Sequence, residues 1–240
     1  MPEARLPDIA SRAVGQAIST PKAVVLLSGG LDSAVALYIA MEKGYDCHCL
    51  VFDYGQRHKK EIDAAKLIAR RAGAGLCVVK LDLPWKGSSL TDKKRILPFD
   101  RAIGDIKSGI PSTYVPSRNT IFLSIACSFA EAIGAQKIFI GAHYEDSSGY
   151  PDCRKDYLEA FRRVMKLGTK AGIDNALTLE FPLIDKSKSG IIRTGNRLGV
   201  PFDLTWSCYK GGKRQCRRCD SCILRAKGFK EAGIKDPSIK

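Results

Sequence analysis

The stretch LSGGLDSA, residues 27–34, decides the expected fold because it joins an apolar run to a helical pattern. Residues 23–27 are apolar and predict a buried strand, and apolar side chains recur at helical spacing in residues 31–43. Gly29 and Gly30 let the main chain turn tightly and approach an anion without obstruction by Cβ atoms. Unpaired N–H groups at the helix start, together with the helix dipole, favour negative charge there. The junction therefore predicts a phosphate-binding loop at the end of the first strand.

This predicted phosphate loop is not a Walker A loop, because no lysine follows its glycines at the required spacing. Ser28 and Ser33 can add hydroxyl donors, and Asp32 can help to hold a Mg²⁺ ion that bridges the phosphates. The predicted nucleotide contacts are Leu27, Ser28, Gly29, Gly30, Leu31, Asp32 and Ser33. A glycine turn with an N-cap serine, which is common after any strand, is the alternative that the loop alone leaves open.

Strand and helix patterns alternate along the rest of the chain. Further strands are expected at residues 47–54, 76–81, 137–141 and 178–181, and helices at 59–73, 119–134, 156–167 and 189–198. This alternation predicts a doubly wound α/β fold with a mostly parallel sheet, whose ligands lie beyond the carboxyl ends of the strands. Residues 84–117 are polar, irregular and too long for a packed connection, which favours a lid or binding loop. We expect an N-terminal extension over residues 1–21, an ATP-binding domain over 22–200 and a small metal-binding segment over 201–240.

The bulk composition narrows the functional classes. The chain has 240 residues, is 45% hydrophobic and carries 39 Lys and Arg against 25 Asp and Glu, a net charge of +14. A basic surface suits nucleotides, phosphorylated substrates or RNA, although a merely solvated basic surface is the alternative. No apolar run approaches the roughly 20 residues that span a bilayer, and Arg12 splits the apolar residues of the N-terminus. We therefore expect no membrane association, no secretory signal and a cytoplasmic location.

Four of the nine cysteines lie within fifteen residues near the end of the chain, in the spacing C-x₇-C-x₂-C-x₂-C. Zinc prefers four thiolates in a closed tetrahedral site, so the spacing predicts one structural Zn²⁺ ion. Its predicted ligands are Cys208, Cys216, Cys219 and Cys222. Lys213, Arg214, Arg217 and Arg218 lie nearby in the sequence and would offset the negative charge of the site. An iron–sulfur cluster and redox-active thiols are the alternatives.

The string SGGLDS resembles that of the PP-loop ATP pyrophosphatase superfamily, whose members grip the pyrophosphate of ATP while a substrate attacks the α-phosphorus. Four further strings narrow the resemblance: FDYGQRH at 52–58, STYVPSRNTIFLSIA at 112–126, EDSSGYPDCR at 145–154 and TWSCYKGG at 205–212. Together they resemble the 7-cyano-7-deazaguanine synthase (QueC) family over roughly residues 22–234. The resemblance implies a carbon–nitrogen ligase that uses ATP and ammonia to convert 7-carboxy-7-deazaguanine into its nitrile, through an adenylated acid and an amide. That reaction lies on the route to queuosine or archaeosine in tRNA. The resemblance also implies that the protein needs no stably bound nucleic acid and is compatible with a homodimer.

The resemblance also suggests roles for residues that would contact ATP or the acid. Lys188 matches a lysine that meets ATP phosphates, with a surface lysine at a helix start as the alternative. Arg118 and Asn119 suit a carboxylate or phosphate, with an N-cap and a salt bridge as the alternative. Asp53 and Gln56 lie at the end of the second strand and are expected near the adenosine.

Other residues are candidates for binding the deazaguanine ring. A carboxylate can accept hydrogen bonds from its N1–H and exocyclic amine, and Asp152 is the candidate for this role. Asp146 could do the same or hold a metal ion. Tyr114 and Tyr150 could stack on the base, although aromatic side chains more often belong to the core. His58 could shuttle protons, but a structural role is more common for a lone histidine.

The chain departs from the family pattern at three positions. Ser117 stands where the family usually has glycine, Lys186 where it has leucine and Gly190 where it has glutamate. A paralogue that stops at the amide or adenylates another substrate therefore stays open, as does a tRNA-modifying thiolase or lysidine-type ligase. A zinc-ribbon RNA-binding protein is the alternative from another class, but it has no use for SGGLDS.

Overall fold

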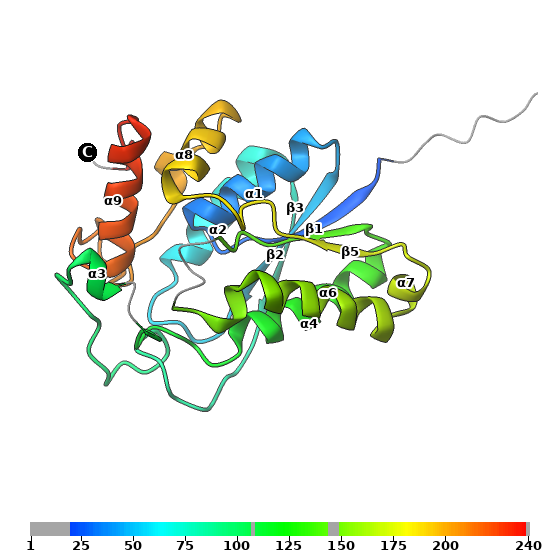
Figure 1. Cartoon of the computed structure of the whole chain (residues 1–240), viewed down its shortest axis with the longest axis horizontal. Helices are drawn as coiled ribbons and strands as arrows, with labels where there is room; N and C mark the ends of the chain where they lie inside the picture. Colours follow the sequence, from blue (N-terminus) through cyan, green and yellow to red (C-terminus); the bar gives the residue numbers. More distant parts are fainter. Residues whose placement is uncertain (1–19, 107–108, 144–148, 239–240) are drawn as a thin grey trace, which may run out of the picture.

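Five parallel strands form one sheet in the computed structural model, which describes residues 20–106, 109–143 and 149–238 (Figure 1). β1 (Lys22–Leu26) lies at the centre between β2 (Asp46–Asp53) and β4 (Lys137–Phe139). β3 (Gly75–Lys80) and β5 (Thr178–Glu180) form the two edges. All four strand pairs are parallel. The predicted doubly wound α/β fold is confirmed.

The strand order β3-β2-β1-β4-β5 changes direction at β1. The chain runs from β1 outward to β2 and β3, then crosses back to β4 on the other side of β1. Connections on the two sides of such a switch point cover opposite faces of the sheet, which leaves a crevice at the carboxyl ends of β1 and β4. Residues 27–30 leave β1 at this crevice, so the topology places the predicted phosphate loop where α/β proteins bind ligands.

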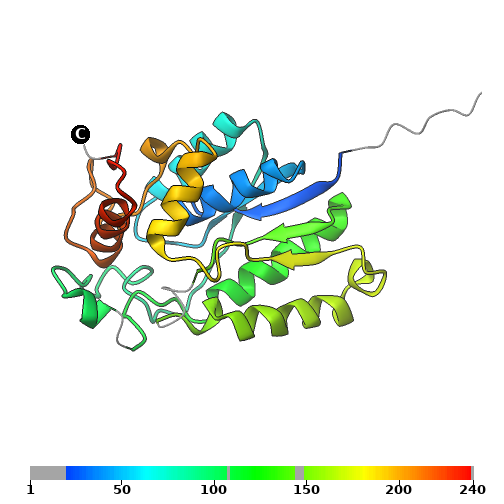
Figure 2. The same ribbon diagram turned by 45° about the horizontal axis from the view of Figure 1, so that its top comes forward.

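Helices cover both faces of the sheet (Figures 1 and 2). α1 (Leu31–Glu42), α2 (Lys60–Ala72) and α8 (Lys188–Arg197) lie on one face, and α4 (Arg118–Ile133) and α6 (Lys155–Gly168) on the other. Side chains of β1 alternate between the two faces because successive strand residues point in opposite directions. Ala23 and Val25 enter one apolar cluster, and Val24 and Leu26 enter the other. A strand buried on both faces explains the continuous apolar run in the sequence.

The C-terminal part adds a helix that the sequence analysis did not predict, α9 (Asp220–Ala232). It lies with α3 (Ile103–Ile106) beyond the carboxyl ends of the strands, at the left of both views. α9 packs closely on α8, because a Cβ atom at Gly228 would lie 2.4 Å from Cγ of Lys188. Phe229 enters the same apolar cluster as Ala23 and Val25. The predicted domain boundary at residue 200 stays a prediction.

The remaining elements are short: α7 (Lys170–Ile173) and the 3₁₀ helices η1 (Pro151–Cys153) and η2 (Phe202–Leu204). Within residues 84–117, the described part is irregular apart from α3 and one isolated bridge between Phe99 and Cys219. Among the described residues, no helix is both long and apolar enough to cross a membrane.

Candidate active site

The loop between β1 and α1 is held by hydrogen bonds among its own serines. The Ser28 N–H donates to Oγ of Ser33 at 3.1 Å, and the two hydroxyls lie 3.0 Å apart. Ser33 also donates to the carbonyl of Gly30 at 3.1 Å. Gly29 has a φ of +84°, and a Cβ atom there would lie only 2.1 Å from the carbonyl oxygen of Glu61. Glycine is therefore required at position 29 by both backbone conformation and space.

The N-terminus of α1 is open towards this crevice. Gly30 is its N-cap, and no side chain of the described chain caps the helix. The N-cap serine that the sequence left as an alternative is therefore wrong. The free N–H groups of the first turn and the positive end of the helix dipole suit an anion.

Asp32, Lys188 and His143 meet beside the loop. The Lys188 ammonium donates to both carboxylate oxygens of Asp32 at 2.9 Å and to Nε2 of His143 at 2.8 Å. Burial is the largest single effect on the pKa of Asp32 and raises it, but the charges of Lys188 and His143 and the hydrogen bonds to the carboxylate together keep this pKa below its ordinary value. His143 is 1% exposed and follows β4. Sequence reasoning missed His143, although its place just after a strand next to β1 was a usable signal.

A cavity of about 300 Å³ extends from the phosphate loop across the carboxyl ends of β1 and β2. This volume is at the lower end of the range for small-molecule sites, roughly 300–1,000 Å³. The predicted contacts that line it are Leu27, Ser28, Gly30, Leu31, Asp32, Ser33, Gln56, Arg118, Asn119, Tyr150 and Lys188. Residues from the C-terminal segment also line it, among them Trp206, Tyr209 and Asp220. The structure thus brings most of the predicted site together and adds a wall from the cysteine-rich tail.

Arg118 opens α4 at the far side of this cavity. Its Nη1 donates to the hydroxyl of Tyr54 at 3.1 Å, and its guanidinium lies 5.8 Å from the centre of the Tyr54 ring. The preceding Ser117 has a φ of +52° and a ψ of +25°, the left-handed region that glycine occupies without steric cost. The backbone at Ser117 therefore has the conformation expected of the family glycine, although the residue type differs.

Several predicted contacts have other tasks in this structure. Asp152 is buried behind the cavity wall, where its carboxylate accepts the backbone N–H of Asn119 at 2.9 Å and supports the start of α4. Asp53 pairs with Lys59 at 2.7 Å. The Tyr114 hydroxyl accepts the Ser117 N–H at 3.1 Å. Neither these residues nor Gly29 lines the cavity. Asp146 lies outside the described residues.

Gln56 and Tyr150 line the cavity but also make local bonds. The Gln56 side chain accepts the Tyr54 N–H at 2.9 Å and donates to the carbonyl of Phe52 at 3.1 Å, which closes the turn after β2. The Tyr150 and Thr113 hydroxyls lie 2.8 Å apart. Both residues are thus held in place by their neighbours.

Glu61 and His58 also line the cavity, and the sequence analysis did not assign Glu61. Burial raises the pKa of Glu61 to about 7, with partial compensation by Arg118. Nδ1 of His58 is buried and has no hydrogen-bond partner in the described chain. Burial lowers the pKa of this histidine. A signal for Glu61 was present, because it lies three residues after FDYGQRH, at the start of a helix.

The four predicted metal ligands converge. The sulfur atoms of Cys208, Cys216, Cys219 and Cys222 all lie within 4.8 Å of one another. Four thiolates around one zinc ion, each at about 2.3 Å, lie about 3.8 Å apart, so one tetrahedral ion fits this group. Backbone N–H groups point at the sulfurs: that of Cys216 donates to Cys208 at 3.3 Å, and that of Cys219 to Cys216 at 3.3 Å. Such donors stabilise the thiolate form that a metal requires.

The cysteine segment is bound to residues 99–101 of the long irregular loop. The Asp100 N–H donates to the carbonyl of Arg218 at 2.8 Å, and the Arg218 side chain pairs with the Asp100 carboxylate at 2.9 Å. Arg101 forms two bonds with the carboxylate of Asp220, one of 3.1 Å. The backbone N–H of Trp206 donates to the carbonyl of Gly29 at 2.9 Å. The segment therefore contacts both the loop that closes one end of the cavity and the phosphate loop itself.

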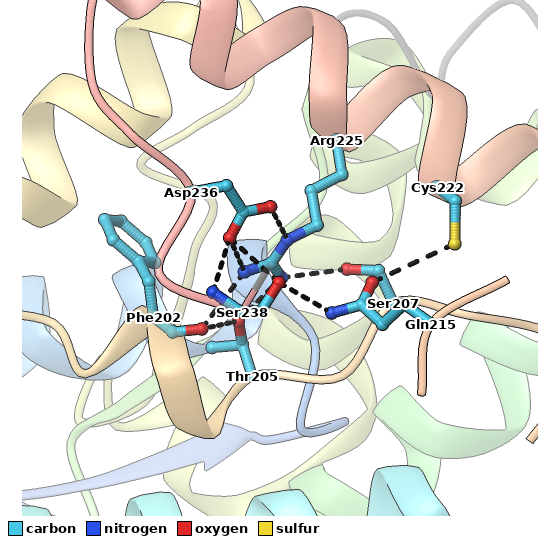
Figure 3. Close-up of polar contacts among 8 residues, drawn as sticks. All are labelled: Phe202, Thr205, Ser207, Gln215, Cys222, Arg225, Asp236 and Ser238. Carbon is cyan, nitrogen blue, oxygen red and sulfur yellow. Dashed lines mark hydrogen bonds and ion pairs between the residues drawn. The ribbon is translucent and has the colours of Figure 1, made fainter. Parts of the chain in front are cut away.

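A buried arginine fixes this segment further (Figure 3). Arg225 forms two bonds with Asp236, at 2.7 and 2.9 Å. Its other bonds go to Thr205 at 2.7 Å, to the carbonyl of Phe202 at 3.0 Å and to Ser207 at 3.2 Å. These five bonds match the five N–H groups of a guanidinium. Residues 202–207, which lead up to the metal ligands, are thus tied to α9 and to the C-terminal end.

Comparison with known proteins identifies the family. The model of "Queuosine biosynthesis protein QueC" matches residues 22–233 of this chain. The chain belongs to the QueC family. Among QueC relatives, the 7-cyano-7-deazaguanine synthase of Trichormus variabilis is 52% identical over 219 residues, covering 90% of this chain and 96% of the relative. The synthase of the same name from Thermoplasma acidophilum is 50% identical over 217 residues, covering 90% of each.

Solved structures resemble the QueC-family chain more distantly. The NMN synthetase of Francisella tularensis is 13% identical, with a TM-score of 0.49, and covers 90% of this chain and 79% of that structure. The NH₃-dependent NAD synthetase of Campylobacter jejuni is 15% identical, with a TM-score of 0.45, and covers 78% and 67%.

Proposed function

We propose that this chain is a 7-cyano-7-deazaguanine synthase, a ligase that converts 7-carboxy-7-deazaguanine and ammonia into the nitrile with consumption of ATP. The observation that carries the proposal is the open phosphate loop, which faces Lys188 on one side and shares a cavity with Arg118. Relatives of that name, about half identical over nine-tenths of the chain, support the choice of substrate.

The reaction needs two activations, because neither a carboxylate nor an amide loses its oxygen readily. A carboxylate oxygen attacks the α-phosphorus of ATP, pyrophosphate leaves, and an acyl adenylate forms. Ammonia displaces AMP to give the amide. The amide oxygen attacks the α-phosphorus of a second ATP and pyrophosphate leaves. Loss of AMP and of both protons of the amide nitrogen then leaves the carbon–nitrogen triple bond. The protein contributes position and charge rather than a nucleophile of its own.

The residues of the cavity can supply this positioning and charge. The first-turn N–H groups of α1 and the hydroxyls of Ser28 and Ser33 would bind the leaving pyrophosphate. Lys188, held between Asp32 and His143, would turn its ammonium towards the new negative charge. The Arg118 guanidinium, positioned by Tyr54, would orient the acid.

Two metal ions fit the residues present. Asp32, in the first turn of α1, has the hard oxygen ligands that Mg²⁺ prefers and would hold such an ion. The ion would neutralise charge on the pyrophosphate. The four cysteines would hold a Zn²⁺ ion with no open coordination position, and this ion would stabilise the fold.

A product assay tests the proposal. The purified protein is incubated with Mg-ATP, ¹⁵N-ammonium and 7-carboxy-7-deazaguanine, and the products are identified by mass spectrometry. We expect ¹⁵N-labelled amide followed by nitrile, with two AMP formed per nitrile. ADP without AMP would contradict adenylation, and accumulation of amide alone would favour the amide-forming alternative.

Substitution of the phosphate-binding residues is the matched test of mechanism. Lys188→Met should lower kcat by roughly 10²- to 10³-fold, because it removes a charge that acts on the leaving group. Lys186→Met, two residues earlier, removes the same charge outside the cavity lining and is the control. Equal losses in the two variants would remove Lys188 from the mechanism.

A further inference from the structure

The carboxylates that line the cavity in the described chain are not equivalent. Those of Asp32 and Asp220 each accept two hydrogen bonds from a cation, Lys188 and Arg101 respectively. Within residues 20–106, 109–143 and 149–238, no hydrogen bond or ion pair to the Glu61 carboxylate is found. Glu61 is thus a cavity carboxylate whose acceptor capacity is left for a ligand.

The position of Glu61 is fixed by the phosphate loop. It lies in the first turn of α2, and its own carbonyl oxygen lies where a Cβ atom of Gly29 would be. The cavity that its side chain lines is bounded by Arg118, at the start of α4, and by Trp206 and Tyr209 of the C-terminal segment. Glu61 therefore lies between the loop that would hold the phosphates and the walls that would hold the second substrate.

An ionised carboxylate binds one of the two bases in the reaction, deazaguanine, better than the other, adenine. It only accepts hydrogen bonds, and its two oxygens match two adjacent N–H donors. The deazaguanine ring offers such a pair, its N1–H and exocyclic amine. The corresponding edge of adenine has an amine beside an acceptor nitrogen, so a carboxylate favours the guanine type of base over ATP. Asp152, the residue first expected to read this edge, lies outside the cavity lining and holds α4 instead.

We propose that Glu61 is the specificity-determining residue that accepts the N1–H and exocyclic amine of the deazaguanine substrate. This inference rests on the proposed function. The opposite charges of Glu61 and Arg118 then match the two polar ends of the acid: its donor edge meets the carboxylate, and its own carboxyl group meets the guanidinium. An unpaired carboxylate in a desolvated cavity is costly, and such groups are concentrated at binding sites.

The test compares Glu61→Gln, which keeps the shape but offers only one acceptor oxygen, with Asp63→Asn. Asp63 is exposed in the same helical turn and does not line the cavity, so it controls for lost charge. Two substrates are used: 7-carboxy-7-deazaguanine and its analogue without the exocyclic amine. Binding of a non-hydrolysable ATP analogue is measured separately, and thermal unfolding shows that each variant is folded.

We expect the wild-type protein and Asp63→Asn to prefer 7-carboxy-7-deazaguanine over the analogue without the exocyclic amine by about 100-fold in kcat/KM. This is the scale expected when a bidentate contact is lost. Glu61→Gln should raise KM for this acid and reduce the preference below about 5-fold, while the dissociation constant of the ATP analogue changes less than 3-fold. Wild-type binding of the acid near pH 6.5 should release a proton, measured by calorimetry in buffers of different ionisation enthalpy, and Glu61→Gln should abolish this release.

Two outcomes would overturn the inference. In the first, Glu61→Gln weakens ATP binding or raises the Mg²⁺ requirement, while the preference for 7-carboxy-7-deazaguanine over the analogue persists. Glu61 would then be a residue that binds metal or phosphate. In the second, the variant loses activity on both acids equally. Failure of the wild-type protein to form amide or nitrile would instead contradict the proposed function itself.

Discussion

At the scale of single residues, Glu61 shows a conflict between stability and binding. Burial raises the pKa of its carboxyl group from 4.5 to about 7. The folded state therefore holds a proton that the unfolded state releases between these two values. The free energy of unfolding should fall by roughly 3–3.5 kcal/mol as pH rises from 4.5 to 7, and it should be level above pH 7.

Glu61→Gln removes this pH dependence because glutamine does not ionise. We expect the variant to be about as stable as the wild-type protein at pH 4.5 and roughly 3–3.5 kcal/mol more stable at pH 8, although its activity falls. Urea unfolding at the two pH values measures the difference. A variant that is less stable than the wild-type protein at pH 8 would show that the folded state needs the carboxylate.

At the scale of elements, the start of α8 lacks half of a capping box. The Ser187 hydroxyl accepts the Gly190 N–H at 3.2 Å, but glycine has no side chain to return a bond to the Ser187 N–H. Gly190→Glu restores the S-x-x-E pattern and replaces a helical glycine, and a Cβ atom there meets nothing closer than 3.4 Å. We expect a gain of about 1–2 kcal/mol in the free energy of unfolding. Gly190→Ala, measured beside it, separates helix propensity from capping; an equal gain in both variants would exclude a capping contribution.

A metal ion held by the four cysteines, as proposed above, should stabilise the long loop as well as the C-terminal segment. Asp100 donates its N–H to Arg218, between two cysteine ligands, and Trp206 donates its N–H to Gly29. Removal of the metal by a chelator should therefore speed amide hydrogen exchange at Asp100 and Trp206, while the central strand β1 stays protected. Exchange resolved by mass spectrometry on peptides 97–106 and 202–212 provides the measurement. Unchanged exchange at Asp100 would show that the loop is held without the metal.

At the scale of the whole molecule, local patterns predicted the parallel sheet and the convergence of four cysteines, because each depends on neighbours in the sequence. The apolar run before Ser28 and the two x₂ spacings are signals of this kind. They did not predict the ion pair of Lys188 with Asp32, the contact of Trp206 with Gly29, or the capping of α4 by Asp152. Each of these joins residues at least 33 positions apart, and their meeting depends on strand order and helix packing. Glu61 is difficult to recognise for a related reason: what marks it is that its side chain has no partner among the residues that the structure describes.

A chain of hydrogen bonds joins Asp236 to the phosphate loop: Arg225 bonds to Asp236 and to Thr205 and Ser207, and the neighbouring Trp206 bonds to Gly29. Arg225 and Asp236 are each less than one-tenth exposed, so removal of either charge leaves the other buried without compensation. We expect Asp236→Leu or Arg225→Met alone to lower the free energy of unfolding by about 3–5 kcal/mol.

The double variant Arg225→Met/Asp236→Leu should be more stable than either single variant, because it buries no unpaired charge. It still lacks the bonds to Thr205, Ser207 and Phe202 that position the segment before Cys208. Trp206 should therefore support the phosphate loop less well, and the affinity for an ATP analogue should fall even where stability recovers. Urea unfolding and equilibrium binding on the same four proteins separate these effects. Full recovery of nucleotide affinity together with stability would show that Arg225 serves the fold alone.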